Sequence, residues 1–185
     1  ASAVLQWTNA SAMLGRMIVG PGVCEQSPPQ IAQEDGRTYP KDIPNEVIGK
    51  GGNITFAGRW ADQYIEKEDI SPKTTIVTTL DSDNRPHLMY FSALRYAYIA
   101  CLDPIHASFQ PISIFTNNIW DVPAPMRVIA TGNSFWNIVL AMRPHMLRNF
   151  ASHSQSMQTL QDTNFWSVRT IVEDGHQFWR TYFRF

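Results

Sequence analysis

Glu46-Val-Ile-Gly-Lys-Gly-Gly-Asn53 decides the predicted fold, because a short apolar run ends there in glycines and leads into a helical pattern. The same arrangement recurs further along the chain in Arg127-Val-Ile-Ala-Thr-Gly-Asn-Ser134. α/β proteins bind phosphate at such turns, since glycine lets the backbone approach the ligand and a helix N-terminus favours an anion. Two such turns in one chain indicate a nucleotide cofactor.

Composition narrows the class of protein. The 185 residues predict a single domain over 1–185 with its own core. A net charge of −1, with 17% charged residues, gives no electrostatic footprint for nucleic acid or an anionic membrane, so neither is a predicted partner. The two cysteines lack metal-ligand spacing, which predicts free thiols and no metal site. Without a basic and apolar leader at its start, the chain is expected to be cytoplasmic.

The rest of the chain alternates predicted strands and helices. A glycine-punctuated loop is expected over 15–22. Asp174-Gly175 lies between apolar runs at 165–173 and 177–185, which predicts a closing β-hairpin. The other predicted strands are 3–8, 46–48, 74–79, 88–91 and 127–130, and the predicted helices are 30–35, 56–68, 92–101 and 134–142. This order predicts an α/β fold, with a mixed, mostly parallel central sheet, helices on both faces and a C-terminal antiparallel hairpin.

In this order the segments resemble the dihydrofolate reductase family, especially the reductase domain of bacterial riboflavin biosynthesis. Residues 11–21 resemble the loop after the family's first strand, and Val47-Ile-Gly-Lys50 with Phe56-Ala-Gly-Arg-Trp60 is similar to its Gly-Arg-x-Thr and Phe-Ala-Gly-x-Trp motifs. Val128-Ile-Ala-Thr-Gly132 resembles its Val-x-Gly-Gly turn. The resemblance spans nearly the whole chain, although the arginine of the Gly-Arg motif is Lys50 here and one turn glycine is Ala130.

The resemblance implies an NADPH-dependent reductase that transfers a hydride to a small planar heterocycle, such as a pterin, a folate or a pyrimidine of riboflavin synthesis. Glu34 or Asp35 would be the acid that binds or protonates the substrate, the alternative being a solvated surface carboxylate. A homodimer is also implied, as in many bacterial members. NADPH would be contacted by Ile18, Val19 and Gly20 at the nicotinamide, by Gly49, Lys50, Gly51 and Gly52 at one end of the phosphates, by Thr78 and Thr79 at the 2′-phosphate, and by Thr131, Gly132, Asn133 and Ser134 at the other end.

Other interpretations of the same residues stay open. Each glycine turn alone is also compatible with an ordinary strand–helix corner. Ile48-Gly-Lys-Gly-Gly52 is similar to the Gly-x-x-Gly loop of a KH domain, which would bind single-stranded RNA. A third hypothesis is a non-enzymatic subunit of a larger assembly, suggested by the long irregular segment 21–45 and the many aromatic residues.

Overall fold

The structure is a computed structural model, and it describes residues 5–7, 15–20, 44–47, 49–81, 84–150 and 152–185. The chain divides into two compact units. The first combines Ala1–Phe109 with Asn149–Phe185, and the second is Gln110–Arg148. The single domain that the sequence predicts over 1–185 stays a prediction.

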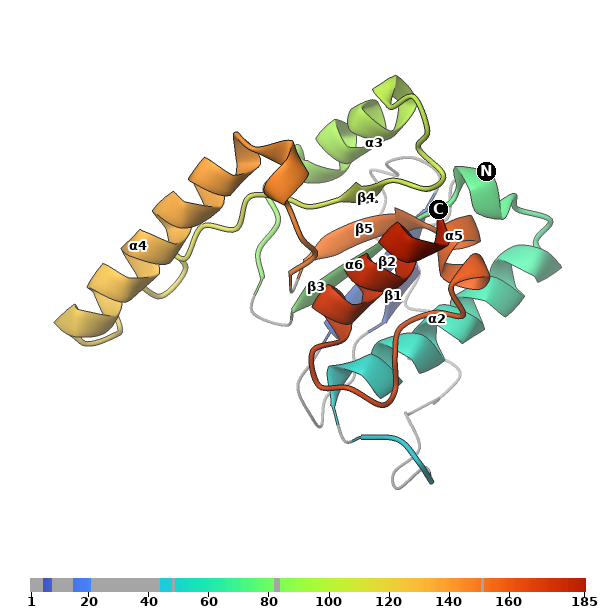
Figure 1. The fold of residues 1–185 in the computed structure, drawn as a ribbon, viewed down its shortest axis with the longest axis horizontal. Helices are drawn as coiled ribbons and strands as arrows, with labels where there is room; N and C mark the ends of the chain where they lie inside the picture. The colour runs from blue at the N-terminus through green and yellow to red at the C-terminus, as the bar shows by residue number, and fades with distance from the viewer. Residues whose placement is uncertain (1–4, 8–14, 21–43, 48, 82–83, 151) are drawn as a thin grey trace. The chain divides into compact units, whose positions relative to one another are not determined.

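The first unit is built on a five-stranded sheet in the order β1-β2-β3-β5-β4 (Figure 1). Every pairing between described strands is antiparallel. The coarse α/β prediction is therefore confirmed, whereas a mostly parallel sheet is not observed in the described part of the chain. The strands are β1 (Leu5–Trp7), β2 (Gly15–Gly20), β3 (Ile76–Asp81), β4 (Ser108–Phe109) and β5 (His153–Ser156).

Several predicted strands are wrong, and this explains the missing parallel connections. Residues 46 and 47 are not in a strand, 88 and 89 form a turn, and 127–130 are helical. The loop predicted over 15–22 is wrong at 15–20, which form β2. Apolar runs of three or four residues do not distinguish a strand from a helix or a coil, and the predicted strand–helix–strand units depended on such runs.

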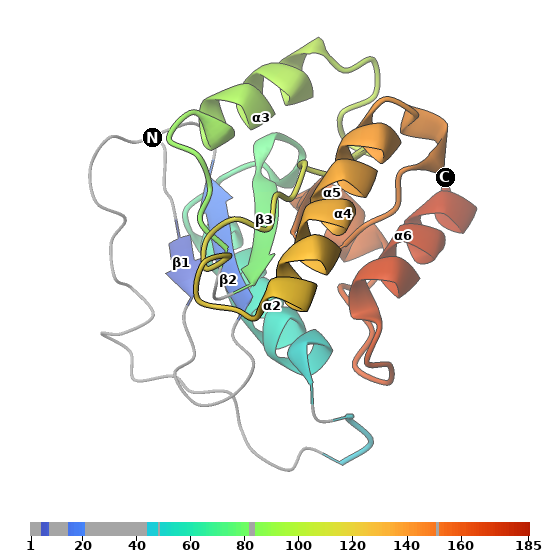
Figure 2. The same cartoon turned by 90° about the vertical axis from the view of Figure 1, so that its left-hand side faces the viewer.

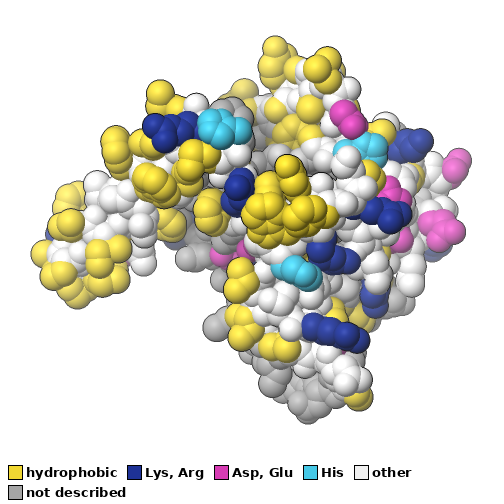
Figure 3. Space-filling model, viewed as in Figure 1, with side chains coloured by type: hydrophobic (Ala, Val, Ile, Leu, Met, Phe, Trp, Pro, Cys, Tyr) yellow, Lys and Arg dark blue, Asp and Glu magenta, His cyan; other side chains and the backbone are white. Residues whose placement is uncertain are grey.

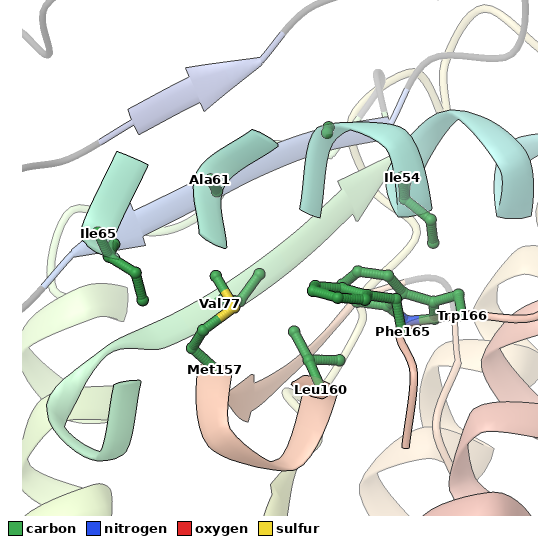
Figure 4. Packing of buried hydrophobic residues seen from close by; sticks show 9 residues of the cluster. Ile54, Ala61, Ile65, Val77, Met157, Leu160, Phe165 and Trp166 are labelled. Atoms are coloured by element: carbon green, nitrogen blue, oxygen red, sulfur yellow. The ribbon is translucent and has the colours of Figure 1, made fainter. Parts of the chain in front are cut away.

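Helix α2 (Lys50–Lys67) supplies one wall of the core. It includes the predicted helix 56–68 up to residue 67 but begins six residues earlier. Ile54, Ala61 and Ile65 share one helix face and are almost fully buried. Figure 4 shows this face against Val77 of β3 and against Met157, Leu160, Phe165 and Trp166. The apolar core of the first unit thus lies between α2, β3 and the segment 157–166.

The remaining helices of the first unit lie on both faces of the β3–β5 pair. They are α3 (Tyr90–Ala100), α5 (Met157–Asp162), α6 (Glu173–Arg184) and a 3₁₀ turn η1 (Pro72–Thr74). On one face, Gln177 of α6 donates to Gln155 of β5. On the other face, the Tyr90 hydroxyl of α3 lies 3.3 Å from the Oγ of Ser154. Figure 2 shows α3 and α6 flanking β3 from different sides.

The C-terminal hairpin predicted around Asp174-Gly175 is wrong, because these residues lie in the first turn of α6. The Asp-Gly pair is a common hairpin turn, but acidic residues are also favoured in the first turn of a helix, where the helix dipole is positive. The polar side chains of Gln177 and Thr181, four residues apart, are buried on the inner face of this helix. That helical spacing decides the structure of the segment.

The second unit consists of α4 (Ala124–Ala141), the 3₁₀ turn η2 (Pro144–Met146) and the extended segment before α4. The Ser134 hydroxyl accepts from the backbone N–H of Phe115 and donates to the carbonyl of Ala130. An apolar face of α4 is exposed, as Figure 3 shows, and it comprises Val128, Ile129, Phe135 and Trp136. In the part of the chain that the structure describes, no helix has the length and apolarity needed to cross a membrane.

Candidate functional site

The candidate site lies in the first unit, where one strand ends and two helices begin. Asp81 is the last residue of β3, Lys50 is the first residue of α2, and Glu173 and Asp174 open α6. β5 pairs antiparallel with β3, so that its first residue, His153, stands opposite Thr79 near the end of β3. Residues from four distant parts of the sequence therefore meet at one place.

Lys50 is the centre of this cluster. Its Nζ lies 2.8 Å from the Oδ1 of Asp81, 3.3 Å from the Oδ2 of Asp174 and 3.8 Å from the Oε1 of Glu173. The side chains of Lys50, Glu173 and Asp174 are mostly buried, whereas that of Asp81 is 35% exposed. One ammonium group thus holds three carboxylates, and Asp81 is the most accessible of them.

The environment changes the proton affinities of Lys50 and Asp174 in a way that favours acid–base chemistry. Burial raises the pKa of Asp174, and although Lys50 opposes this, the pKa rises from 3.8 to about 6. Burial lowers the pKa of Lys50, but the charges of Asp174, Asp81 and Glu173 outweigh it and raise the pKa overall. Near neutral pH, Lys50 is charged and Asp174 is close to its titration point.

His153 is a buried neighbour of Asp174 and is 1% exposed. Its Nδ1 is 3.5 Å from the Oδ1 of Asp174 and 3.1 Å from the carbonyl oxygen of Phe150. The indole N–H of Trp166 donates to its Nε2 at 3.2 Å. Burial lowers the pKa of His153 from 6.5 to about 4, so the ring is neutral at neutral pH.

The Oδ1 atom of Asp174 is buried and has no hydrogen-bond partner among the described residues. Buried carboxylate oxygens are normally hydrogen-bonded, so an exception inside a cluster of charged residues points to a functional site. The described residues contain no group of three or more histidine, cysteine or acidic side chains arranged to hold a metal ion. Ser82 and Asp83, which follow Asp81, lie outside the described residues.

The residues predicted to bind NADPH belong to different elements. Gly49–Gly52 are the N-cap and first turn of α2, at the candidate site. Thr78 and Thr79 are buried in β3, where Thr78 bonds to Ser154 and Thr79 lies 3.2 Å from His153. Thr131, Gly132, Asn133 and Ser134 lie inside α4, so the turn predicted there is wrong. Ile18, Val19 and Gly20 are in β2, and Glu34 and Asp35 lie outside the described residues.

Packing explains one of the glycines that the sequence assigns to phosphate binding. A Cβ on Gly51 would collide with the carbonyl oxygen of Ser167 and approach the Cβ of Glu173. Gly58 lies two turns further on the same face of α2, and a Cβ there would lie 2.9 Å from the Cδ1 of Phe165. Both glycines therefore let the segment 165–167 lie close against α2. Among the described residues other than its chain neighbours, Gly49 has no such close contact, since a Cβ there would meet the carbonyl oxygen of Val47 at 3.9 Å.

Sequence reasoning missed Asp81, His153, Glu173 and Asp174. A signal existed for Asp81, because it follows a strand of β-branched residues and opens a polar turn. A second signal existed for Glu173 and Asp174, because an acidic pair before Gln177 and Thr181 also fits the start of an amphipathic helix. Nothing local indicated His153, since its role depends on pairing with a strand more than seventy residues earlier.

Comparison with known protein families, curated proteins and solved structures gives no match for this chain. The resemblance to the dihydrofolate reductase family stays a prediction.

Proposed function

We propose that the chain is an enzyme that transfers a group from a phosphate-bearing donor to the hydroxyl of an acceptor, with Asp174 as the general base. The observation that carries this proposal is the Asp174 carboxylate itself. It is mostly buried, its Oδ1 has no described hydrogen-bond partner, and its pKa is raised to about 6. A general base works best when its pKa lies near the working pH.

The charges around Asp174 suit a reaction that removes a proton from a hydroxyl and releases an anion. Lys50 stays protonated beside Asp174, with its Nζ 3.3 Å from the Oδ2. The acceptor's hydroxyl would donate to Oδ1 before giving up its proton, and because Oδ1 is buried in the ligand-free structure, binding of the acceptor would have to open the site to reach it. The ammonium group of Lys50 could then stabilise negative charge that develops on the leaving group.

Two helix N-termini support a phosphate-bearing donor. α2 and α6 both begin at the site, and each helix end carries about half a positive charge. With Lys50 they supply about two positive charges against the three carboxylates. The phosphates would lie at the start of α2 beside Gly49, where a Cβ would meet the carbonyl oxygen of Val47 at 3.9 Å and, apart from the chain neighbours of Gly49, no other described atom within 4 Å.

A donor screen tests this function. The purified protein is incubated with nucleoside triphosphates and with nucleoside diphosphate-linked sugars, with magnesium chloride present, and release of nucleoside diphosphate or phosphate is measured. We expect one donor class to raise the melting temperature and to be turned over. Asp174→Asn should keep the melting-temperature shift and lose turnover by about 10²-fold or more, whereas Asp162→Asn, at an exposed carboxylate on α5, should change neither. Full turnover by Asp174→Asn, or no binding of any donor at millimolar concentration, would refute the proposal.

The NADPH-dependent reductase is a second candidate, supported by the glycine-rich start of α2. One observation weakens it, because residues 131–134 lie inside α4 and do not form a glycine turn. Titration with NADPH and NADH separates the two candidates, because micromolar binding with preference for NADPH would favour the reductase.

A non-enzymatic subunit of a larger assembly is the third candidate. The exposed apolar face of α4 favours it, because faces of this kind often mark interaction sites. The donor screen also bears on this candidate, since turnover that depends on Asp174 would exclude a purely structural role.

A further inference from the structure

We propose that Trp166 and His153 are positioning residues for Asp174: the indole N–H holds the His153 ring as the neutral tautomer whose protonated Nδ1 faces the Oδ1 of Asp174. This inference rests on the proposed function of Asp174 as a base. It assigns a role to two buried side chains that would not contact the substrate.

The tautomer follows from the hydrogen bonds. An indole N–H can only donate, so the Nε2 of His153 must accept from Trp166 and cannot carry a proton. The neutral ring then carries its proton on Nδ1. That atom has three oxygen neighbours, namely the carbonyl of Phe150 at 3.1 Å, the hydroxyl of Thr79 at 3.2 Å and the Oδ1 of Asp174 at 3.5 Å.

The neutral ring matters because a charged one would weaken the base. Protonating His153 would place a full positive charge beside Asp174, and a cation at that distance lowers a carboxyl pKa by about one to three units. Protonation would also require Nε2 to give up the hydrogen bond from Trp166. Burial keeps the ring neutral, and the hydrogen bond from Trp166 decides which of its two nitrogens carries the proton.

All the charged groups around Asp174 contribute to its pKa. Lys50 faces it from α2, Asp81 from the end of β3, and Glu173 precedes it on α6. His153 approaches from β5. Lys50 and the two carboxylates are the same in a variant of Trp166, so a change in the titration of Asp174 would be attributable to the ring.

Nuclear magnetic resonance of the ligand-free protein tests the proposal. Carbon-13 shifts of the aspartate carboxyls follow Asp174, assigned by its loss in Asp174→Asn, and nitrogen-15 shifts of the histidine rings report the tautomer. At pH 7 we expect His153 to be protonated on Nδ1 alone. In Trp166→Phe, which keeps an aromatic ring but removes the N–H, we expect the neutral His153 ring to carry its proton partly on Nε2, and the pKa of Asp174 to rise because its Oδ1 then faces a lone pair rather than an N–H.

The control is Trp60→Phe, which removes an indole N–H from a tryptophan that packs against the same core but is not bonded to His153. It should leave the titration of Asp174 unchanged. An unchanged Asp174 in a folded Trp166→Phe variant would overturn the proposal. So would a wild-type His153 ring with its proton on Nε2, a result that does not depend on any variant folding. No substrate is needed, so failure here is distinguishable from failure of the donor screen.

Discussion

At the scale of single residues, burial shifts the pKa values of Asp174 and His153 in opposite directions. Asp174 has a pKa of about 6 in the folded protein against 3.8 ordinarily, and His153 about 4 against 6.5. The folded state binds a proton at Asp174 more tightly than the unfolded chain does, and at His153 less tightly. At about 1.4 kcal/mol per pKa unit, each group changes the free energy of unfolding by about 3 kcal/mol across its range. The two effects largely cancel between pH 4 and 6.

Asp174→Asn should stabilise the protein at neutral pH. A raised carboxyl pKa gives stability that is present below the unfolded pKa of 3.8 and is lost as the pH rises through about 6. The neutral amide avoids that loss, so the variant should gain up to about 3 kcal/mol at pH 8 and nothing at pH 3. Urea unfolding at a series of pH values measures this gain. A constant difference across pH, or a gain of the same size in Asp162→Asn, would contradict it.

His153→Gln should reveal the opposite slope. A lowered histidine pKa means that wild-type stability is lost as the pH falls from 6.5 towards 4, because the folded protein resists protonation. The glutamine side chain does not titrate, so the stability difference between wild type and variant should shrink by about 3 kcal/mol over that range. The packing cost of the substitution is the same at each pH and drops out of the slope. Parallel pH profiles for the two proteins would show that His153 is not held neutral by its surroundings.

At the scale of elements, two glycines that have similar sequence surroundings differ in how closely other residues pack against them. Gly51, at the start of α2, has the backbone of Ser167 where its Cβ would be. Gly132, in the interior of α4, has nothing within 4 Å of that position. The first is required by close packing, whereas the second only weakens its helix.

Alanine at these two positions should therefore have opposite effects. Gly51→Ala should lower the free energy of unfolding by about 1–3 kcal/mol, because backbone cannot move aside as easily as a side chain. Gly132→Ala should stabilise α4 by about 0.5–1 kcal/mol through helix propensity. Thermal and urea unfolding of the two variants measure both. Destabilisation by Gly132→Ala would favour the glycine turn that the sequence predicts at this position.

The sequence predicts elements well where the pattern is long and poorly where it is short. The β-branched run at 74–79 and the periodic segment at 56–68 correspond to β3 and most of α2. The run Val128-Ile129 has a strong preference for strands, but it lies in the second turn of an 18-residue helix. The residues around a short run decide whether it forms a strand or a helix, and a pattern of four residues does not contain that information.

At the scale of the whole molecule, the two units differ in how much they bury. The first unit holds the apolar cluster around Ile54, Val77 and Leu160. In residues 110–148, the described side chains that are buried belong to Ser134 and Leu140. The second unit therefore has few contacts that are lost only on complete unfolding.

Hydrogen exchange should show this difference. Amide protons in α4 should exchange through local opening at a much lower free energy than those facing the core in α2, because few buried side chains hold α4 in place. Exchange measured by mass spectrometry or nuclear magnetic resonance on the intact chain separates the two helices. Equal protection in α2 and α4 would mean that the second unit is stabilised as strongly as the first.

The candidate site could be predicted only in part at this scale. Lys50 and the glycines beside it are singled out by the sequence, and they lie at the site. Its carboxylates come from β3 and α6, and these meet Lys50 only because the fold brings residue 50 close to residues 81 and 174. No local pattern carries that information.

The interior of the first unit is unusually polar in its centre. All four residues of β5, His153 to Ser156, are buried, and the Gln155 side chain is hydrogen-bonded to Thr181 and Gln177. Unfolding exposes these groups to water, and newly hydrated polar surface lowers the heat capacity, whereas apolar surface raises it. Calorimetry should therefore find a heat capacity change below the usual value of about 12–15 cal/mol/K per residue. A protein of this kind loses little stability on cooling, because the curvature of its stability with temperature is small.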